Sequence, residues 1–173
     1  MDHDLDLHAD APALTAALTD IASVSGEEGP LADAIERALT RVPYLAVTRH
    51  GNTLVARTSL GREERVVLAG HIDTVPHAAN FPSRWNTERT VLTGVGTSDM
   101  KSGVAVQLRL AATMAAPNRD VTYVFYDCEE VAVERNGLYK LSRSEPDLLS
   151  GDFAVLLEPI GRASCRERVC HNV

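Results

Sequence analysis

The 173-residue sequence predicts an α/β fold with a mixed, largely parallel sheet and helices on both faces. Two observations support this class. Short runs rich in apolar and β-branched residues, at 66–69, 121–126 and 153–157, are typical of buried strands. Apolar residues at helical spacing lie between these runs, most clearly over 100–116. Strands that alternate with helices favour a sheet that is covered on both sides.

The first third of the chain is expected to form two helices and a hairpin. Asp10 can cap the first helix, whose apolar residues extend to Ile21. A second helix is expected over 27–41, where apolar residues four apart share one face. Strands over 44–50 and 53–58 flank a Gly-Asn pair, which is a hairpin turn signal.

The rest of the chain predicts a strand–helix alternation with one long connection. Residues 74–98 are rich in Pro, Gly, Asn and Thr, with one short strand expected near 90–92. The helix over 100–116 follows, and another is expected over 137–143, ahead of the last buried strand at 153–157. The inward side of the longer helix is expected to carry Val104, Leu108 and either Ala111 or Ala112.

Composition excludes several classes of partner. The net charge of −7 argues against nucleic acid and anionic membranes, which both favour basic patches. No apolar run approaches the length that spans a bilayer. Residues 1–6 are acidic and lack the basic and apolar regions of a signal peptide. We therefore expect a cytoplasmic protein.

Residues 160–173 do not resemble the rest of the chain. They have no apolar periodicity, and they resemble one reading frame of a sequencing adapter fused to the gene. We expect an artefactual tail, although Cys165 and Cys170 could instead form a disulfide or half of a zinc site. Cys128 alone supports no disulfide framework.

Acidic and imidazole side chains gather where the predicted strands end. Because ligands of open α/β sheets bind outside the carboxyl ends of the strands, we expect these side chains to converge. His71 and Asp73 lie two residues apart, a spacing that puts both on one side of an extended chain. Such a carboxylate-rich set is costly to bury without a cation, and it suits zinc, cobalt or manganese. The full set is His71, Asp73, Asp99, Glu129, Glu130 and Glu158.

Each of these residues also has a purely structural explanation. The pair His71 and Asp73 could be a hydrogen-bonded strand end, and Asp99 could cap the helix that starts at Met100. The pair 129–130 could be a solvated turn, and Glu158 a charge at the end of a strand. Their joint occurrence at successive strand ends favours the metal site.

Four motifs resemble those of the co-catalytic zinc amidohydrolases and exopeptidases. They are Gly-His-Ile-Asp-Thr-Val-Pro at 70–76, Ser-Asp-Met-Lys-Ser-Gly at 98–103, Glu-Glu at 129–130 and Glu-Pro at 158–159. Their order and spacing are similar over nearly all of residues 12–159, and residues 23–28 resemble the family's N-terminal segment. Residues 96–103 and 125–130 are most similar to the succinyl-diaminopimelate desuccinylase group.

The resemblance implies a three-layer catalytic domain with two zinc ions per full-length subunit, for which cobalt can substitute. His71 and Glu158 would bind one ion, Asp99 would bridge both, and Glu130 would bind the second. Asp73 would orient His71, and Glu129 would be the general base. The implied reaction hydrolyses an N-acyl amide, with N-succinyl-LL-2,6-diaminopimelate as the expected substrate, in lysine and diaminopimelate biosynthesis.

Alternatives within the family are an acetylornithine deacetylase, an aminoacylase or a metallocarboxypeptidase. A non-catalytic metal-binding fragment is a further alternative. The family carries a lid and dimerisation domain after its fourth motif and takes a last His ligand from near the end of a longer chain. We therefore expect residues 1–159 to be the N-terminal part of a catalytic domain, inactive alone, whose full-length form is a homodimer. His171 is not assigned to the missing ligand.

Overall fold

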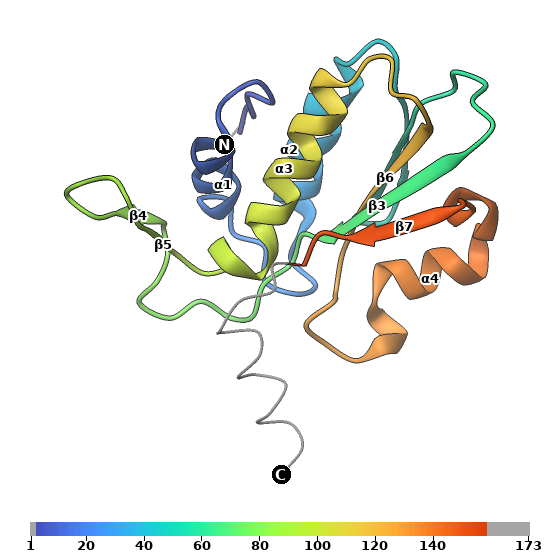
Figure 1. Cartoon of the computed structure of the whole chain (residues 1–173). Helices are drawn as coiled ribbons and strands as arrows, with labels where there is room; N and C mark the ends of the chain where they lie inside the picture. Colours follow the sequence, from blue (N-terminus) through green and yellow to red (C-terminus); the bar gives the residue numbers. More distant parts are fainter. Residues whose placement is uncertain (1–2, 159–173) are drawn as a thin grey trace.

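Five strands form one mixed sheet in the order β1-β2-β6-β3-β7 in the computed structural model, which describes residues 3–158. β1 and β2 pair antiparallel, as do β2 and β6, whereas β6, β3 and β7 run parallel (Figure 1). The predicted mixed sheet is confirmed, and its parallel part carries the motifs. The strands are β1 Ala46–His50, β2 Thr53–Arg57, β3 Arg65–His71, β6 Asp120–Tyr126 and β7 Phe153–Leu156.

Helices cover both faces of this sheet, as predicted. The helices α1, α2 and α3 pack with one face of the sheet around the larger apolar core, while α4 packs on the other face around Leu141 (Figure 1). The first helix starts where the sequence predicts, because Asp10 Oδ1 accepts a hydrogen bond from Ala13 N at 2.7 Å. The helices are α1 Ala11–Thr19, α2 Gly29–Thr40, α3 Ser102–Thr113 and α4 Gly137–Ser144.

Two crossover connections, each containing a helix, join the parallel strands. α3 connects β3 to β6 on one face, and α4 connects β6 to β7 on the other. Since β6 and β7 lie on either side of β3, the direction of winding reverses at β3. Because β6, β3 and β7 run parallel, their carboxyl ends lie at the same edge of the sheet, where ligands of such folds bind.

Smaller elements fill the connections. In the long loop, β4 (Arg84–Trp85) pairs antiparallel with β5 (Leu92–Thr93), so the short strand expected near 90–92 lies slightly later. The described residues also form three short helical turns: η1 Thr97–Lys101, η2 Val133–Arg135 and η3 Pro146–Leu149. Within residues 3–158, no helix is both long and apolar enough to cross a bilayer.

Two elements differ from the sequence-based prediction. The prediction of a buried strand at 153–157 was wrong, because β7 is an edge strand with Phe153 64% and Leu156 57% exposed. An apolar run indicates a strand but does not tell which of its neighbours are present. The helix predicted over 100–116 begins only at Ser102, although Val104, Leu108 and Ala111 are fully buried as expected.

Asp120 anchors the loop at the opposite end of β6. Its buried carboxylate accepts hydrogen bonds from Thr58 Oγ1, Leu60 N and Arg62 N at 2.7, 2.8 and 2.9 Å. Burial disfavours the charged carboxylate, but these bonds and the nearby Arg65 guanidinium lower the pKa of Asp120 to about 2. Because the folded-state pKa lies below the ordinary value, this carboxylate stabilises the fold above about pH 4.

We predict that Asp120→Asn lowers the free energy of unfolding by about 1–3 kcal/mol at pH 7, since an amide group would face the loop donors. The difference from wild type should shrink as the pH falls from 4 toward 2, where the native carboxyl also becomes protonated. Urea unfolding at pH 7, 5, 3 and 2.5 measures this, with the exposed Glu63→Gln as control. A difference that is equal at all four pH values would contradict the prediction.

Candidate metal centre

His71 and Asp73 lie at the carboxyl end of β3 and contact each other as their spacing predicts. The imidazole is 1% exposed, and its Nδ1 lies 3.1 Å from the Asp73 carbonyl oxygen and 3.3 Å from Asp73 Oδ1. The backbone N of His71 donates to Met100 Sδ at 3.1 Å. Nε2 is therefore the ring nitrogen that faces the other acids.

Asp99 and Glu158 complete a group around that nitrogen. Asp99 Oδ1 lies 3.0 Å from His71 Nε2, and Glu158 Oε2 lies 3.8 Å from the same atom. One donor atom from each of the three residues lies within 4.8 Å of the others. The structural explanation of Asp99 as a cap is wrong, because no side-chain hydrogen bond caps η1 or α3. The peptide bond between Asp99 and Met100 is cis.

Glu129 and Glu130 follow β6 and form a second group with His71. Their donor atoms and one ring nitrogen also lie within 4.8 Å of one another. Asp73 holds their backbone, because Glu129 N donates to Asp73 Oδ1 at 2.9 Å and Glu130 N to Oδ2 at 3.1 Å. All six residues predicted from the sequence thus come to one edge of the sheet, with His71 common to both groups.

The electrostatics of the centre reflect an excess of carboxylates. Burial and neighbouring acids raise the pKa of Glu130 and of Glu158 to about 7. Burial opposes the charged imidazole, but Asp73, Asp99 and Glu129 outweigh it and raise the pKa of His71 to about 10. Burial likewise opposes the charged form of Asp73, yet hydrogen bonds from His71, Ser25 and two backbone amides lower its pKa.

This donor set fits a divalent metal ion. One imidazole nitrogen and several carboxylate oxygens are ligands that zinc and manganese accept. A cation would relieve the repulsion that now favours protonated Glu130 and Glu158, and Asp73 contacts His71 as carboxylates commonly contact a metal-binding histidine.

Sequence reasoning missed three residues around the centre: Ser25 and Glu28, which lie outside the four motifs, and Lys101, which lies within the second motif. Ser25 Oγ donates to Asp73 Oδ2 at 2.6 Å, and Glu28 accepts from Cys128 N at 3.2 Å. Lys101 is buried, and its Nζ donates to the carbonyl oxygens of Leu18 and Ile21, both at 3.0 Å. The resemblance of residues 23–28 to a family segment was the one signal for the first two.

The fold and the centre together define an α/β protein whose strand ends carry a carboxylate-rich site suited to divalent ions. Residues 67–163 match the family described as peptidase family M20/M25/M40. This match spans more than half of the chain, and the chain belongs to that family.

Two curated relatives with higher sequence identity are both named succinyl-diaminopimelate desuccinylases. A Mycobacterium tuberculosis protein with the provisional name succinyl-diaminopimelate desuccinylase DapE is 52% identical over 169 residues, covering 97% of this chain and 47% of that protein. The succinyl-diaminopimelate desuccinylase of Corynebacterium glutamicum is 48% identical over 162 residues, covering 91% of this chain and 43% of that enzyme. The chain thus spans about half the length of the curated relatives that it matches.

Solved structures share the fold at low sequence identity. A tripeptidase from Staphylococcus aureus superposes with a TM-score of 0.71 at 21% identity, over 87% of this chain and 43% of that one. The M20 family metallo-carboxypeptidase Sso-CP2 from Sulfolobus solfataricus gives 0.69 at 12% identity, over 88% and 38%. These similarities confirm the predicted three-layer fold.

We predict that the chain in the presence of a chelator becomes less stable as the pH rises from 5 to 8. Glu130 and Glu158 have folded-state pKa values above the ordinary value of 4.5, so the folded state binds more protons in this range. The raised pKa of His71 acts in the same direction, because its stabilisation is full below pH 6.5 and is lost toward pH 10.

Thermal unfolding followed by circular dichroism at pH 5, 6, 7 and 8 measures this dependence. Glu158→Gln should flatten it, whereas Glu134→Gln, an exposed acid outside the centre, should leave it unchanged. Equal slopes for wild type and Glu158→Gln would contradict the prediction.

Proposed function

We propose that the protein carrying this chain is a divalent-metal-dependent amidohydrolase that cleaves N-succinyl-LL-2,6-diaminopimelate to succinate and LL-2,6-diaminopimelate. The observation that carries the proposal is the convergence of His71, Asp99 and Glu158, with Glu129 and Glu130 adjoining, at one sheet edge. The 52% and 48% identities to the desuccinylase-named relatives support the choice of substrate. Lysine and diaminopimelate biosynthesis is then the route that the enzyme serves.

The ligand roles follow from the two groups of donors. His71 and Glu158 would hold one zinc ion, Glu130 a second, and Asp99 would lie between them. Cobalt would be an acceptable substitute. When bound, such ions supply Lewis-acid polarisation of the amide carbonyl. The second ion would need a further ligand, which we expect from a part of the protein beyond this chain.

Glu129 is suited to move the proton. Its carboxylate is exposed at the edge of the centre, and its backbone is fixed by the bond to Asp73. It would accept a proton from the attacking water as the water oxygen bonds to the amide carbon. It would then donate that proton to the nitrogen as the carbon–nitrogen bond breaks, which gives a carboxylic acid and an amine.

The remaining partner and domain assignments belong to the same proposal. We expect residues 1–159 to form the N-terminal part of the catalytic domain, while 160–173 lie outside the described residues. A homodimer built through a lid domain, location in the cytoplasm, and weak or absent turnover by the 173-residue chain alone complete the proposal. The motifs say least about the acyl group and the amine of the substrate, since acetylornithine deacetylases and aminoacylases share them.

We predict that the 173-residue chain binds zinc through the group around His71 and that Asp99→Ala abolishes this binding. Asp99 lies within 4.8 Å of both other donors, so its removal opens the group. Isothermal titration with zinc and then cobalt measures the effect, with Glu134→Ala as the matched control for loss of one negative charge. Failure of the folded wild-type chain to bind either ion would refute the ligand assignment.

We further predict that Glu129→Gln lowers kcat by about 10²–10⁴-fold on N-succinyl-LL-2,6-diaminopimelate, because a general base contributes that much. The assay uses the longest form of the protein that its gene encodes and follows release of the free amine. Zinc affinity should stay near the wild-type value, since the amide retains the shape of the side chain. Wild-type activity in Glu129→Gln would show that another group accepts the proton.

A further inference from the structure

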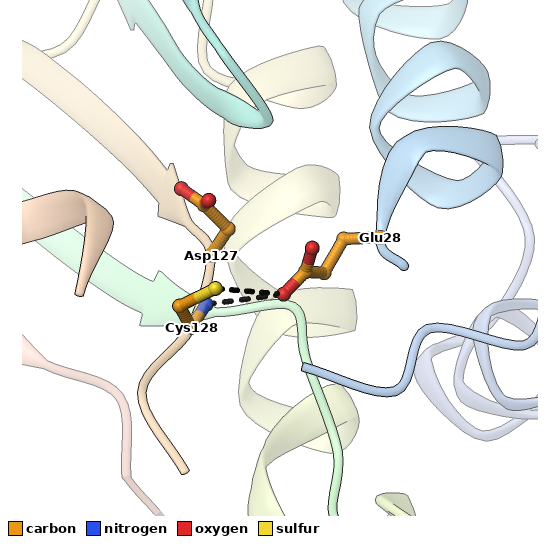
Figure 2. A group of neighbouring side chains, drawn as sticks. All are labelled: Glu28, Asp127 and Cys128. Carbon is orange, nitrogen blue, oxygen red and sulfur yellow. Dashed lines mark hydrogen bonds between the residues drawn. The ribbon is translucent and has the colours of Figure 1, made fainter. Parts of the chain in front are cut away.

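Three consecutive backbone amides in the turn after β6 are held by two buried carboxylates. Asp73 accepts from Glu129 N and Glu130 N, as described above. The preceding amide, Cys128 N, donates instead to Glu28 Oε1 at 3.2 Å, and Cys128 Sγ lies 3.4 Å from the same oxygen (Figure 2). Hydrogen bonds to Glu28 and Asp73 therefore fix the turn that carries the proposed base, Glu129, and a proposed metal ligand, Glu130.

The conformation of Cys128 explains why such a partner is needed. Its φ of +58° places it in the left-handed region, which is unfavourable for a residue with a side chain. Both polar atoms of Cys128 that face Glu28 contact one carboxylate oxygen, so the carboxylate favours this conformation (Figure 2). Asp127, the residue before Cys128, is fixed by a hydrogen bond that its Oδ1 accepts from Thr53 Oγ1.

Burying the Glu28 carboxylate costs free energy, which indicates that the hydrogen bonds it accepts are important for the structure. Its side chain is 0% exposed and forms no ion pair among residues 3–158. Among the described residues, the other hydrogen-bond donors to its carboxylate are neutral: Gly26 N at 2.7 Å and Asn52 Nδ2 at 3.1 Å. A buried carboxylate without a cation requires several good hydrogen bonds, and here they come from three separate segments.

The segment that carries Glu28 is also tied to the end of β3. Ser25 N donates to Thr74 O at 3.1 Å, and Thr74 N donates to Ser23 O at 2.9 Å. Ser25 Oγ reaches Asp73 Oδ2 at 2.6 Å. Residues 23–28 therefore carry one of the two carboxylates that hold the turn and contact the other, which fixes β3 and β6 relative to each other at the centre.

We infer that Glu28 is a positioning residue: by holding Cys128 it sets the direction in which Glu129 and Glu130 leave the turn. This inference rests on the proposed function for its catalytic consequence, but the hydrogen-bond role of Glu28 can be tested without any activity. Glu28 lies outside the four motifs, and the hydrogen bonds that its carboxylate accepts within residues 3–158 come from Gly26, Asn52 and Cys128. Its effect passes through the backbone of the turn.

The experiment compares Glu28→Ala and Glu28→Gln with the exposed neighbour Glu27→Ala as control. Glutamine keeps the length of the side chain and one carbonyl acceptor, whereas alanine leaves Cys128 N without a partner. In Glu28→Ala, amide exchange at Cys128 to Glu130, measured by NMR, should become at least about ten-fold faster because a buried bond is lost. Glu28→Gln should restore most of the protection, and Glu27→Ala should match wild type.

Turnover by the longest form of the protein gives the second readout. Glu28→Ala should lower kcat by about 10–100-fold, the effect expected of a base displaced by about 1 Å, with KM unchanged. Glu28→Gln should recover most of this loss. If Glu28→Ala does not fold, a small rise in exchange and a partial loss of kcat in Glu28→Gln support the inference.

Unchanged exchange at Cys128 to Glu130 in the folded variants would overturn the inference. A fall in kcat that merely follows the folded fraction, with Glu28→Gln no better than Glu28→Ala, would overturn it as well. Absence of hydrolysis by the wild-type enzyme would instead refute the proposed function, and amide exchange would still decide the role of Glu28.

Discussion

The Asp73 carboxylate is the interaction on which the centre depends. It is fully buried, it contacts the imidazole of His71, and it accepts one hydrogen bond from Ser25 and two from the backbone of Glu129 and Glu130. One side chain thereby joins the ends of β3 and β6 and the N-terminal segment. Removing such a carboxylate would leave several buried donors unpaired at once.

The second constraint is charge. The centre gathers carboxylates against one imidazole, and within the described part of the chain His71 is the only cationic group within ion-pair distance of them. The raised pKa values of Glu130 and Glu158 express this excess, since protonation removes part of the repulsion. Lys101 lies nearby, and its Nζ donates to the carbonyl oxygens of Leu18 and Ile21, which ties the loop before α3 to the end of α1.

Much of the fold and of the centre could be predicted from the sequence, because the relevant signals are local. Asp10 caps α1, the apolar periodicity of α3 gives its buried side, and the spacing of His71 and Asp73 gives their shared direction. The edge position of β7 could not be predicted, since Phe153 to Leu156 form an apolar run whichever strands flank them. Ser25 and Glu28 were missed because their partners lie 48 and 100 residues away.

The sequence by itself determined the strand–helix alternation, the polar residues at the strand ends and the membership of the peptidase family M20/M25/M40. These features depend on residue type and on spacing along the chain. Only the tertiary structure decided that β6 and β7 lie on either side of β3 and that two buried carboxylates hold three successive amides of one turn. The physical reason is that a backbone amide has the same donor group in every residue, so only the packed chain selects which carboxylate it meets.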